Sequence, residues 1–307
     1  LGYLQLAIEN FAEGWKNHEY RKSKRILTKN LNLKYKKFFN GKKFKGKLLI
    51  YGEQGLGDQI MFSSMLSELL ALHDDISVSV EERLLPLFRR SFKGINFINN
   101  NRNINNEKFD KYTFIGSLGM FFRKSINDFP KKQKPLLIAD SKKIEEIKKY
   151  LGKGSYKKIG ISWKTSSPNA RKNRSIPLKL FKKILNLNKY RFVDLQYGET
   201  LAERSEIKNE LNIDIFHIDN IDYKNDIESL AAIISQCDIV ITIPNFTTQL
   251  AAALGVPVFV LLPYPADWRW FLNRDSSPWY SNIKLFRQKN IGQWNESLKE
   301  VYNALKD

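Results

Sequence analysis

The chain has 307 residues, of which 42% are hydrophobic and 13% aromatic, so it can build a sizeable core and is long enough for two domains. Its 51 Lys and Arg residues exceed its 32 Asp and Glu residues, giving a net charge of +19. This composition excludes a disordered chain, and the single cysteine excludes an intrachain disulfide framework and fits a reducing compartment.

The positive charge alone is compatible with binding to nucleic acid or to an anionic membrane. The lysines are spread along the whole chain, however, and no nucleic-acid-binding motif accompanies them. We therefore expect no nucleic-acid partner. A nucleic-acid binder would instead show an affinity for DNA or RNA that falls steeply as the salt concentration rises.

No apolar run approaches the roughly 20 residues that a membrane helix needs, since the longest, Val256–Leu262, has the length of a buried strand. Residues 1–25 are charged and lack the pattern of a signal peptide. The first residue is Leu1 rather than Met, so we expect a fragment with an upstream part missing. The predicted location is cytoplasmic, with peripheral contact to the inner face of the membrane left open.

Residues 1–40 have a helical pattern, in which Leu4, Ala7, Ile8 and Phe11 recur at helical spacing. The stretch LGYLQLAIENFAEGWKNHEYR resembles the end of a tetratricopeptide repeat array, which implies further repeats upstream. The match covers less than one repeat unit, so an ordinary N-terminal helical arm is an equal alternative.

Strand and helix patterns alternate from residue 47 onward, which predicts an α/β protein with two parallel, helix-covered sheets. The first domain, residues 47–150, is expected to hold strands at 48–51, 76–80, 95–98 and 112–115 and helices at 58–72 and 84–92. The second, residues 157–290, is expected to hold strands at 159–163, 191–195, 238–243 and 256–262 and helices at 178–185, 227–236 and 246–254. Residues 140–157 read as a helix plus linker, and residues 291–307 as a last helix.

Two such domains predict a cleft between the carboxyl ends of their sheets, where open α/β sheets bind ligands. The first candidate loop is Gly52–Asp58, in which Gly55 and Gly57 allow positive φ or close approach and Gln59 follows. The spacing fits neither a dinucleotide fingerprint nor a phosphate-binding P-loop. Asp58 is either a helix cap, the commoner case, or a general base.

The second and third candidate loops also lie at predicted strand ends. Lys164, Thr165 and Ser166, with Arg174 nearby, concentrate positive charge and hydroxyls that suit a phosphate; a solvated basic loop is the alternative. Between the next strand and helix, backbone N–H groups and hydroxyls suit a diphosphate, with simple capping as the alternative. That set consists of Asn245, Thr247, Thr248 and Gln249.

The remaining chemistry-bearing residues point less clearly to a site. Four aromatic residues in a loop with several prolines either stack on a sugar or base or, more commonly, pack the loop onto its domain: Trp268, Trp270, Trp279 and Tyr280. The three histidines, His18, His73 and His217, have no metal-ligand spacing, so no metal is expected. Cys237 begins an apolar strand and is expected in the core.

Taken in order, five segments resemble the glycosyltransferase-like region that follows tetratricopeptide repeats in many bacterial proteins, which is similar in turn to the heptosyltransferases of lipopolysaccharide synthesis. The segments are GEQGLGDQIMFSSML, GISWKTSSPNARKNRSIPL, DLQYGE, DIESLAAIISQCDIVITIPNFTTQLAAALGVPVFVLLP and DWRWFLNRDSSPWYSNIKLFRQ. The resemblance implies a GT-B fold, with two Rossmann-like domains and a C-terminal helix that crosses back onto the first domain.

The resemblance also implies a function: metal-independent, inverting transfer from a nucleotide-diphosphate sugar, with no cofactor, to an acceptor glycan, lipid or protein. It makes Asp58 the catalytic carboxylate, since the pair Gly57-Asp58 matches the family's Gly-Asp. The donor would be held by the second domain through the second and third loops and through Gln196 and Tyr197 of DLQYGE.

The sequence departs from the family at the third loop. Pro244-Asn245 stands where relatives often carry Asp-Thr or Ser-Asn, and Gln249 stands near the place of a His. Gln can donate a hydrogen bond to a phosphate but cannot become cationic. The alternative function is therefore a catalytically silent nucleotide-sugar binder or scaffold, which needs no base at Asp58.

Overall fold

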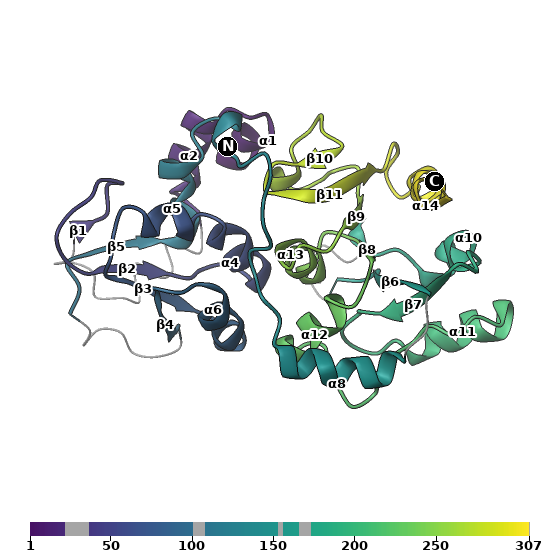
Figure 1. Cartoon of the computed structure of the whole chain (residues 1–307). Helices are drawn as coiled ribbons and strands as arrows, with labels where there is room; N and C mark the ends of the chain where they lie inside the picture. The colour runs from purple at the N-terminus through teal and green to yellow at the C-terminus, as the bar shows by residue number, and fades with distance from the viewer. Residues whose placement is uncertain (22–36, 101–107, 153–155, 166–172, 307) are drawn as a thin grey trace. The chain divides into compact units, whose positions relative to one another are not determined.

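A computed structural model describes residues 1–21, 37–100, 108–152, 156–165 and 173–306. The chain forms two compact units (Figure 1). Unit 1 consists of Leu1–Ile138 and Asp267–Leu272, and unit 2 of Ala139–Ala266 and Asn273–Asp307. Each unit contains one sheet, which confirms the predicted α/β class with two parallel-dominated sheets.

The sheet of unit 1 is entirely parallel and has the strand order β1-β5-β2-β3-β4. Every residue of the central strand β2 is buried, because strands flank it and helices cover the sheet. The strands are β1 (Lys37–Phe38), β2 (Leu48–Tyr51), β3 (Ile76–Val80), β4 (Asn96–Asn99) and β5 (Lys111–Phe114).

The helices of unit 1 are short. The helix predicted at 58–72 is two helices, since Ser64 and Met65 donate to Met61 O and Phe62 O, which tightens the chain between them into an i→i+3 turn. The α-helices are α1 (Gly2–Ala7), α2 (Phe11–His18), α4 (Leu56–Ser63), α5 (Leu66–Leu70), α6 (Leu85–Ser91) and α7 (Gly119–Phe122). The 3₁₀ segments are η1 (Glu82–Leu84), η2 (Ile115–Ser117), η3 (Ile126–Asp128) and η5 (Trp268–Trp270).

The N-terminal arm is only partly the helix that the sequence predicts. Helices α1 and α2 follow the pattern, and Glu9 turns the chain between them with φ 63°. The expectation of helix up to residue 40 is wrong at Lys37–Phe38, because these residues pair with β5 as strand β1. Trp15 fixes α2 on α7: its indole N–H donates to Arg123 O at 2.6 Å, and a Cβ on Gly119 would collide with its ring.

The sheet of unit 2 has the order β10-β11-β9-β8-β6-β7 and is parallel except for β10. The sequence did not predict β11, which extends the sheet beside β9. The strands are β6 (Lys157–Ser162), β7 (Tyr190–Asp194), β8 (Ile239–Thr242), β9 (Val258–Leu262), β10 (Ser276–Ser277) and β11 (Tyr280–Arg287). The helices are α8 (Ser141–Leu151), α10 (Lys182–Leu185), α11 (Leu201–Leu211), α12 (Ile227–Ile234), α13 (Phe246–Ala253) and α14 (Asn295–Lys306), with the 3₁₀ segment η4 (Leu178–Phe181).

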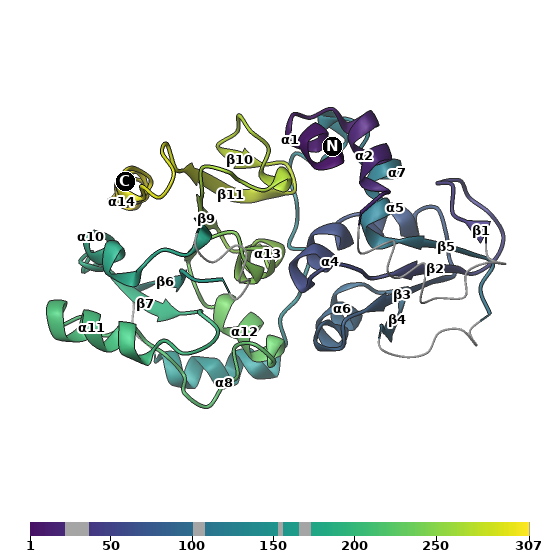
Figure 2. The same cartoon turned by 180° about the vertical axis from the view of Figure 1, so that it is seen from behind.

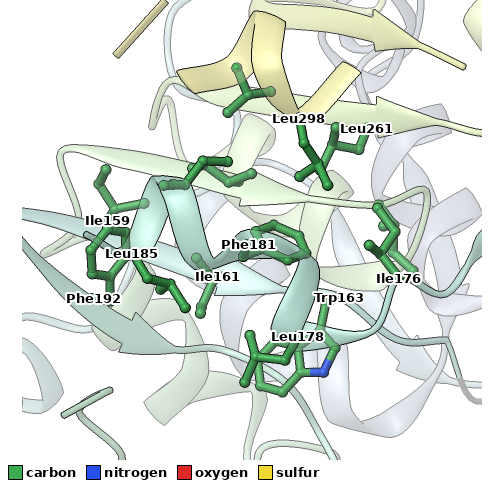
Figure 3. Close-up of a cluster of buried hydrophobic side chains, with 14 of the residues drawn as sticks. Ile159, Ile161, Trp163, Ile176, Leu178, Phe181, Leu185, Phe192, Leu261 and Leu298 are labelled. Carbon is green, nitrogen blue, oxygen red and sulfur yellow. The ribbon is translucent and has the colours of Figure 1, made fainter. Parts of the chain in front are cut away.

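The C-terminal helix α14 belongs to unit 2, so the predicted crossing of residues 291–307 onto the first domain is wrong. Its apolar stripe, Leu298, Val301 and Leu305, completes the core cluster that contains Ile161 and Trp163 (Figure 3). The segment that joins unit 1 is instead Asp267–Leu272.

Helix α8 also belongs to unit 2, although the sequence placed it at the end of the first domain. Its buried residues Ile147 and Leu151 pack within unit 2, and α8 lies beside α12 (Figure 1 and Figure 2). Lys143 approaches Asp226, the N-cap of α12, at 3.9 Å. The boundary between the units therefore falls at residue 139 rather than near 150.

Candidate functional site

Each sheet contains a point where the strand order reverses. In unit 1 the strand β2 lies between β3 and β5, and in unit 2 the strand β6 lies between β7 and β8. Loops diverge at the carboxyl ends of such strands, where open α/β sheets bind their ligands. The three loops predicted from the sequence follow β2, β6 and β8, so each lies at such a point in its own unit.

Asp58 lies in the first turn of α4, and its carboxylate has two partners. Oδ2 accepts a hydrogen bond from Gly55 N at 3.1 Å, which is the predicted capping contact. Oδ1 forms an ion pair with Arg269, which sequence reasoning did not find. The Asp58 side chain remains 20% exposed, so capping and access to a ligand coexist.

Gly52, Gly55 and Gly57 all lack a positive φ, and of these Gly52 serves close approach. A Cβ on Gly52 would collide with Ser79 O, whereas the left-handed residue of the loop is Gln54, with φ 64°. Gln59, expected beside the ligand, is buried, and its Oε1 accepts from Glu81 N at 3.0 Å. Gln59 therefore ties α4 to the segment that follows β3.

Glu53 is the second carboxylate of the loop, and it is fully buried. It pairs with Arg21, whose Nε lies 2.7 Å from Glu53 Oε1 and whose Nη2 donates to Ser117 Oγ at 3.0 Å. Sequence reasoning missed this pair, because no local pattern links Arg21 to a loop 32 residues away. Of the two carboxylates, only Asp58 is placed to meet a ligand.

The ionisable groups around Arg269 are strongly perturbed. Burial would lower the pKa of Arg269, but Asp267 and Asp58 outweigh burial and raise it. Burial, with the positive charge of Arg21, lowers the pKa of His18 to about 3, so His18 is a neutral imidazole. Burial raises the pKa of Tyr3 above its usual value.

In unit 2, Gln196 organises the loop that follows β6. Its Oε1 accepts from Ser162 Oγ at 3.1 Å, from Trp163 N at 3.0 Å and from Lys164 N at 2.7 Å. Gln196 is itself fixed by the buried Asp194, whose Oδ1 accepts from Gln196 N at 2.8 Å. Its Nε2 donates to the carbonyl oxygen of the half-buried Tyr197 at 3.0 Å.

Asn245 connects the loop after β8 to the loop after β6. Its Oδ1 caps α13 by accepting from Thr248 N at 3.2 Å. Its Nδ2 donates to Ser162 Oγ at 2.8 Å and to Lys164 O at 3.3 Å. The structure thus brings together three of the predicted residues, Lys164, Gln196 and Asn245, on the ends of three adjacent strands.

The first turn of α13 carries the remaining residues predicted for the third loop. Thr248 Oγ1 donates to Ile243 O at 2.6 Å. Thr247 Oγ1 and Gln249 Oε1 are buried and have no hydrogen-bond partner among the residues that the structure describes. Asn245 accepts from Thr248 N, and the other first N–H groups of a helix have no acceptor within it, so this end of α13 suits an anion.

The predicted basic group of the second loop is already occupied. Lys164 Nζ pairs with Glu203 and donates to Glu199 O at 3.0 Å, and Trp163 Nε1 donates to the same Glu203 at 3.0 Å. A phosphate at Lys164 would therefore compete with Glu203. Thr165 N donates to Ser175 Oγ at 3.2 Å, Arg174 is half-buried, and Ser166 lies outside the described residues.

The other sequence candidates are structural. Trp268, Trp270, Trp279 and Tyr280 are all buried, as expected for packing, but Trp268 and Trp270 belong to unit 1 rather than to the domain in which the sequence placed them. Cys237 is buried as expected. Within the described ranges, no three His, Cys, Asp or Glu side chains lie together in a way that could hold a metal ion. A search of the same ranges finds no helix long and apolar enough to span a membrane.

The chain is similar to the Protein FlbA of Caulobacter vibrioides (strain ATCC 19089 / CIP 103742 / CB 15), with 32% identity over 324 aligned residues. The alignment covers 99% of this chain and 54% of FlbA, so the chain spans about half the length of this curated relative. No family model matches the chain.

Solved structures with a similar fold are bacterial glycosyltransferases. The glycosyl transferase family 9 structure from Veillonella parvula DSM 2008 matches with a TM-score of 0.59 and 12% identity, covering 84% of this chain and 91% of that one. The ADP-heptose lps heptosyltransferase II of E. coli matches with a TM-score of 0.59 and 15% identity, covering 85% of this chain and 97% of that one. E. coli heptosyltransferase WaaC with ADP-2-deoxy-2-fluoro heptose matches with a TM-score of 0.52 and 12% identity, covering 85% of this chain and 100% of that one. The chain has the GT-B fold of these enzymes, as the sequence resemblance predicted.

Proposed function

We propose that this chain is a glycosyltransferase that moves a sugar from a nucleotide-diphosphate donor to a hydroxyl acceptor by an inverting, metal-independent reaction. The observation that carries the proposal is the network of Gln196, Asn245 and Lys164 at the start of α13. Beside it lie the buried Thr247 Oγ1 and Gln249 Oε1, for which the described part of the chain offers no hydrogen-bond partner. The GT-B fold, shared with glycosyltransferases whose structures were solved with ADP or an ADP-heptose analogue, supports the same reading.

The proposed reaction assigns different tasks to the two units. In unit 1, Asp58 accepts the proton of the acceptor hydroxyl while the hydroxyl oxygen bonds to the anomeric carbon. The bond from that carbon to the phosphate oxygen breaks, and its electron pair leaves with the nucleoside diphosphate. In unit 2, the first-turn N–H groups of α13 and the Gln249 side chain stabilise the negative charge on the diphosphate.

The rival function is a silent nucleotide-sugar binder or scaffold. The ion pairs of two proposed site residues favour it, since Lys164 pairs with Glu203 and Asp58 pairs with Arg269. Gln249 also cannot supply the positive charge that a histidine could. Such a protein would bind nucleotide diphosphates through unit 2 without turnover. The N-terminal end of the sequence resembles tetratricopeptide repeats. Such repeats upstream would fit either function, because they would dock a partner.

The first experiment is a thermal-shift screen with ADP, UDP, GDP and CDP. A diphosphate at about 100 times its Kd stabilises the folded state by about 2.7 kcal/mol, which raises Tm measurably. We expect the protein to prefer one of the four nucleobases. The corresponding nucleotide sugar is then tested for hydrolysis and for transfer to bacterial extract. Binding without turnover supports the scaffold, and no shift with any diphosphate contradicts both functions.

The variant Asp58→Asn tests the proposed role of Asp58 as the general base. We expect turnover to fall about 100-fold or more, because proton removal is lost, while the nucleotide-induced shift in Tm stays the same. Stability alone does not separate the roles, since the substitution also leaves Arg269 without one of its charged partners.

A matched control for D58N is Asp128→Asn. Asp128 accepts from Ser125 N at 2.8 Å, the same kind of cap in the same unit, but on η3. We expect D128N to keep its turnover. Equal turnover in D58N and D128N would show that Asp58 is only a cap.

A further inference from the structure

The segment Asp267–Leu272, called the strap below, packs in unit 1 although unit 2 precedes and follows it in the sequence. The ring of Trp268 stacks on Tyr3 at 6.0 Å and meets Trp15 edge-on at 5.8 Å. Phe271 contacts Phe11 at 6.0 Å, and Leu272 N donates to Ala7 O at 3.2 Å. The strap is therefore fixed on the N-terminal helices α1 and α2.

The strap carries one cation, Arg269, whose guanidinium bridges two carboxylates. Nη2 pairs with Asp58, and Nη1 lies 2.8 Å from Asp267 Oδ1. The guanidinium also lies over the ring of Trp268, with 5.4 Å from Cζ to the ring centre. Only 16% of the side chain is exposed, so packing and both ion pairs determine its position.

Arg269 and Gly55 together fix both oxygens of Asp58. Oδ1 accepts from Arg269 and Oδ2 accepts from Gly55 N, so two donors from segments far apart in the sequence set the plane of the carboxylate. A carboxylate oxygen has two lone pairs, so each oxygen retains capacity for one more donor. Because Asp58 is partly exposed, that capacity is open to an incoming hydroxyl.

We propose that Arg269 is a positioning residue for Asp58: it holds the carboxylate in the orientation of a proton acceptor and balances its charge. This role rests on the proposed function. When Asp58 takes the proton of the acceptor hydroxyl, it becomes neutral and its attraction to Arg269 weakens. Asp267 then still compensates the guanidinium charge, so the bridge lets Asp58 change charge without leaving an unpaired buried cation.

Two substitutions separate the two ion pairs of Arg269. Arg269→Gln removes the donor to Asp58 Oδ1, so the carboxylate keeps only Gly55 N of its two fixed partners and kcat should fall. Asp267→Asn leaves the guanidinium with Asp58 as its one charged partner in the bridge, so Asp58 keeps its donor and kcat should fall less. Asn is as good a helix cap as Asp, so D267N retains the cap on Arg269 N.

The other ionisable groups that interact with Arg269 come from the N-terminal helices. They are Tyr3 of α1 and His18 of α2. Because burial raises the pKa of Tyr3 and lowers the pKa of His18 to about 3, both are neutral between pH 5 and 9. Arg21 interacts with both of them.

The experiment measures hydrolysis of ADP-, UDP-, GDP- and CDP-glucose, with water as acceptor. We expect R269Q to lower kcat about tenfold or more while KM for the nucleotide sugar stays constant, because the donor is proposed to bind unit 2. Arg269→Lys retains the charge and should restore part of kcat, but not all of it, because Lys cannot bridge two carboxylates as a planar fork.

The matched control is Arg83→Gln, which removes a similarly partnered arginine of unit 1; its Nε lies 2.8 Å from Glu81 Oε1. R83Q should keep kcat and KM. An unchanged kcat in R269Q, in a chain that does turn over, would overturn the positioning role alone. No hydrolysis by the unsubstituted chain would overturn the proposed transfer and this role with it.

Discussion

At the scale of single residues, the most constrained groups are buried charges that link the arm to the site of unit 1. Arg21 follows α2, and its guanidinium pairs with Glu53 and Glu19 and donates to Ser117. A buried pair of this kind costs desolvation, but removing one partner costs more. The neighbouring His18 stays neutral because burial and Arg21 both oppose its protonation.

His18 makes stability depend on pH. Its pKa is about 3 in the folded chain against an ordinary 6.5, so below pH 6.5 the unfolded chain binds a proton that the folded chain does not. The contribution of His18 to stability is therefore constant above about pH 7 and falls as the pH drops from 6.5 toward 3. At about 1.4 kcal/mol per pH unit, the loss at pH 5 is about 2 kcal/mol.

Denaturant unfolding of the unsubstituted chain and His18→Phe at pH 7.5 and 5.0 measures this loss. The Phe ring can keep the contacts with Tyr3, Trp15 and Trp268. We expect H18F to lose less stability on acidification. His73, whose pKa burial also lowers, remains as background of the same sign in both chains. An equal loss in both would mean that His18 does not titrate with unfolding.

At the scale of elements, α13 combines a structural cap with the proposed diphosphate site. Asn245 uses its oxygen to cap the helix and its nitrogen to hold the loop after β6. The sequence indicated this loop because a capping residue follows a buried strand. It did not indicate α11 or β11: in α11 only Ile207 is buried, and in β11 polar residues interrupt the apolar pattern.

Two substitutions of Asn245 both remove its Nδ2 hydrogen bonds to Ser162 and Lys164, but they differ in whether the cap on Thr248 N remains. Asn245→Ala removes the cap and should cost about 1 kcal/mol of stability. Asn245→Asp keeps the cap and adds a charge that the helix N-terminus favours, but it repels a diphosphate. We therefore expect N245D to be the more stable variant and the weaker nucleotide binder, about tenfold or more below N245A. Calorimetric titration with the preferred diphosphate checks the order, and the reverse order would exclude a diphosphate at α13.

At the scale of the whole molecule, the chain builds two separate cores, and the strap belongs to the first of them. Trp268 and Trp270 are buried in unit 1, whereas Trp294 is buried in unit 2. A substitution in the strap should therefore act on elements far away in the sequence.

The comparison of Trp268→Ala with Trp294→Ala tests this division. Each removes a buried indole and should cost about 3–5 kcal/mol. Hydrogen exchange should show W268A losing protection in β2, α2 and α4, and W294A losing it in β6, β9 and α10. Loss of protection in unit 2 upon W268A would contradict the assignment of the strap to unit 1.

The α/β class, most strands and the loops that carry Asp58, Lys164 and Asn245 were predictable from the amino-acid sequence. They were predictable because apolar periodicity and strand-end residues are local signals. The tertiary structure alone decided the partners of these residues. Arg269 reaches Asp58 across 211 positions, and α14 stays in unit 2. Such pairings depend on how distant segments pack, and no spacing within a short stretch of chain encodes them.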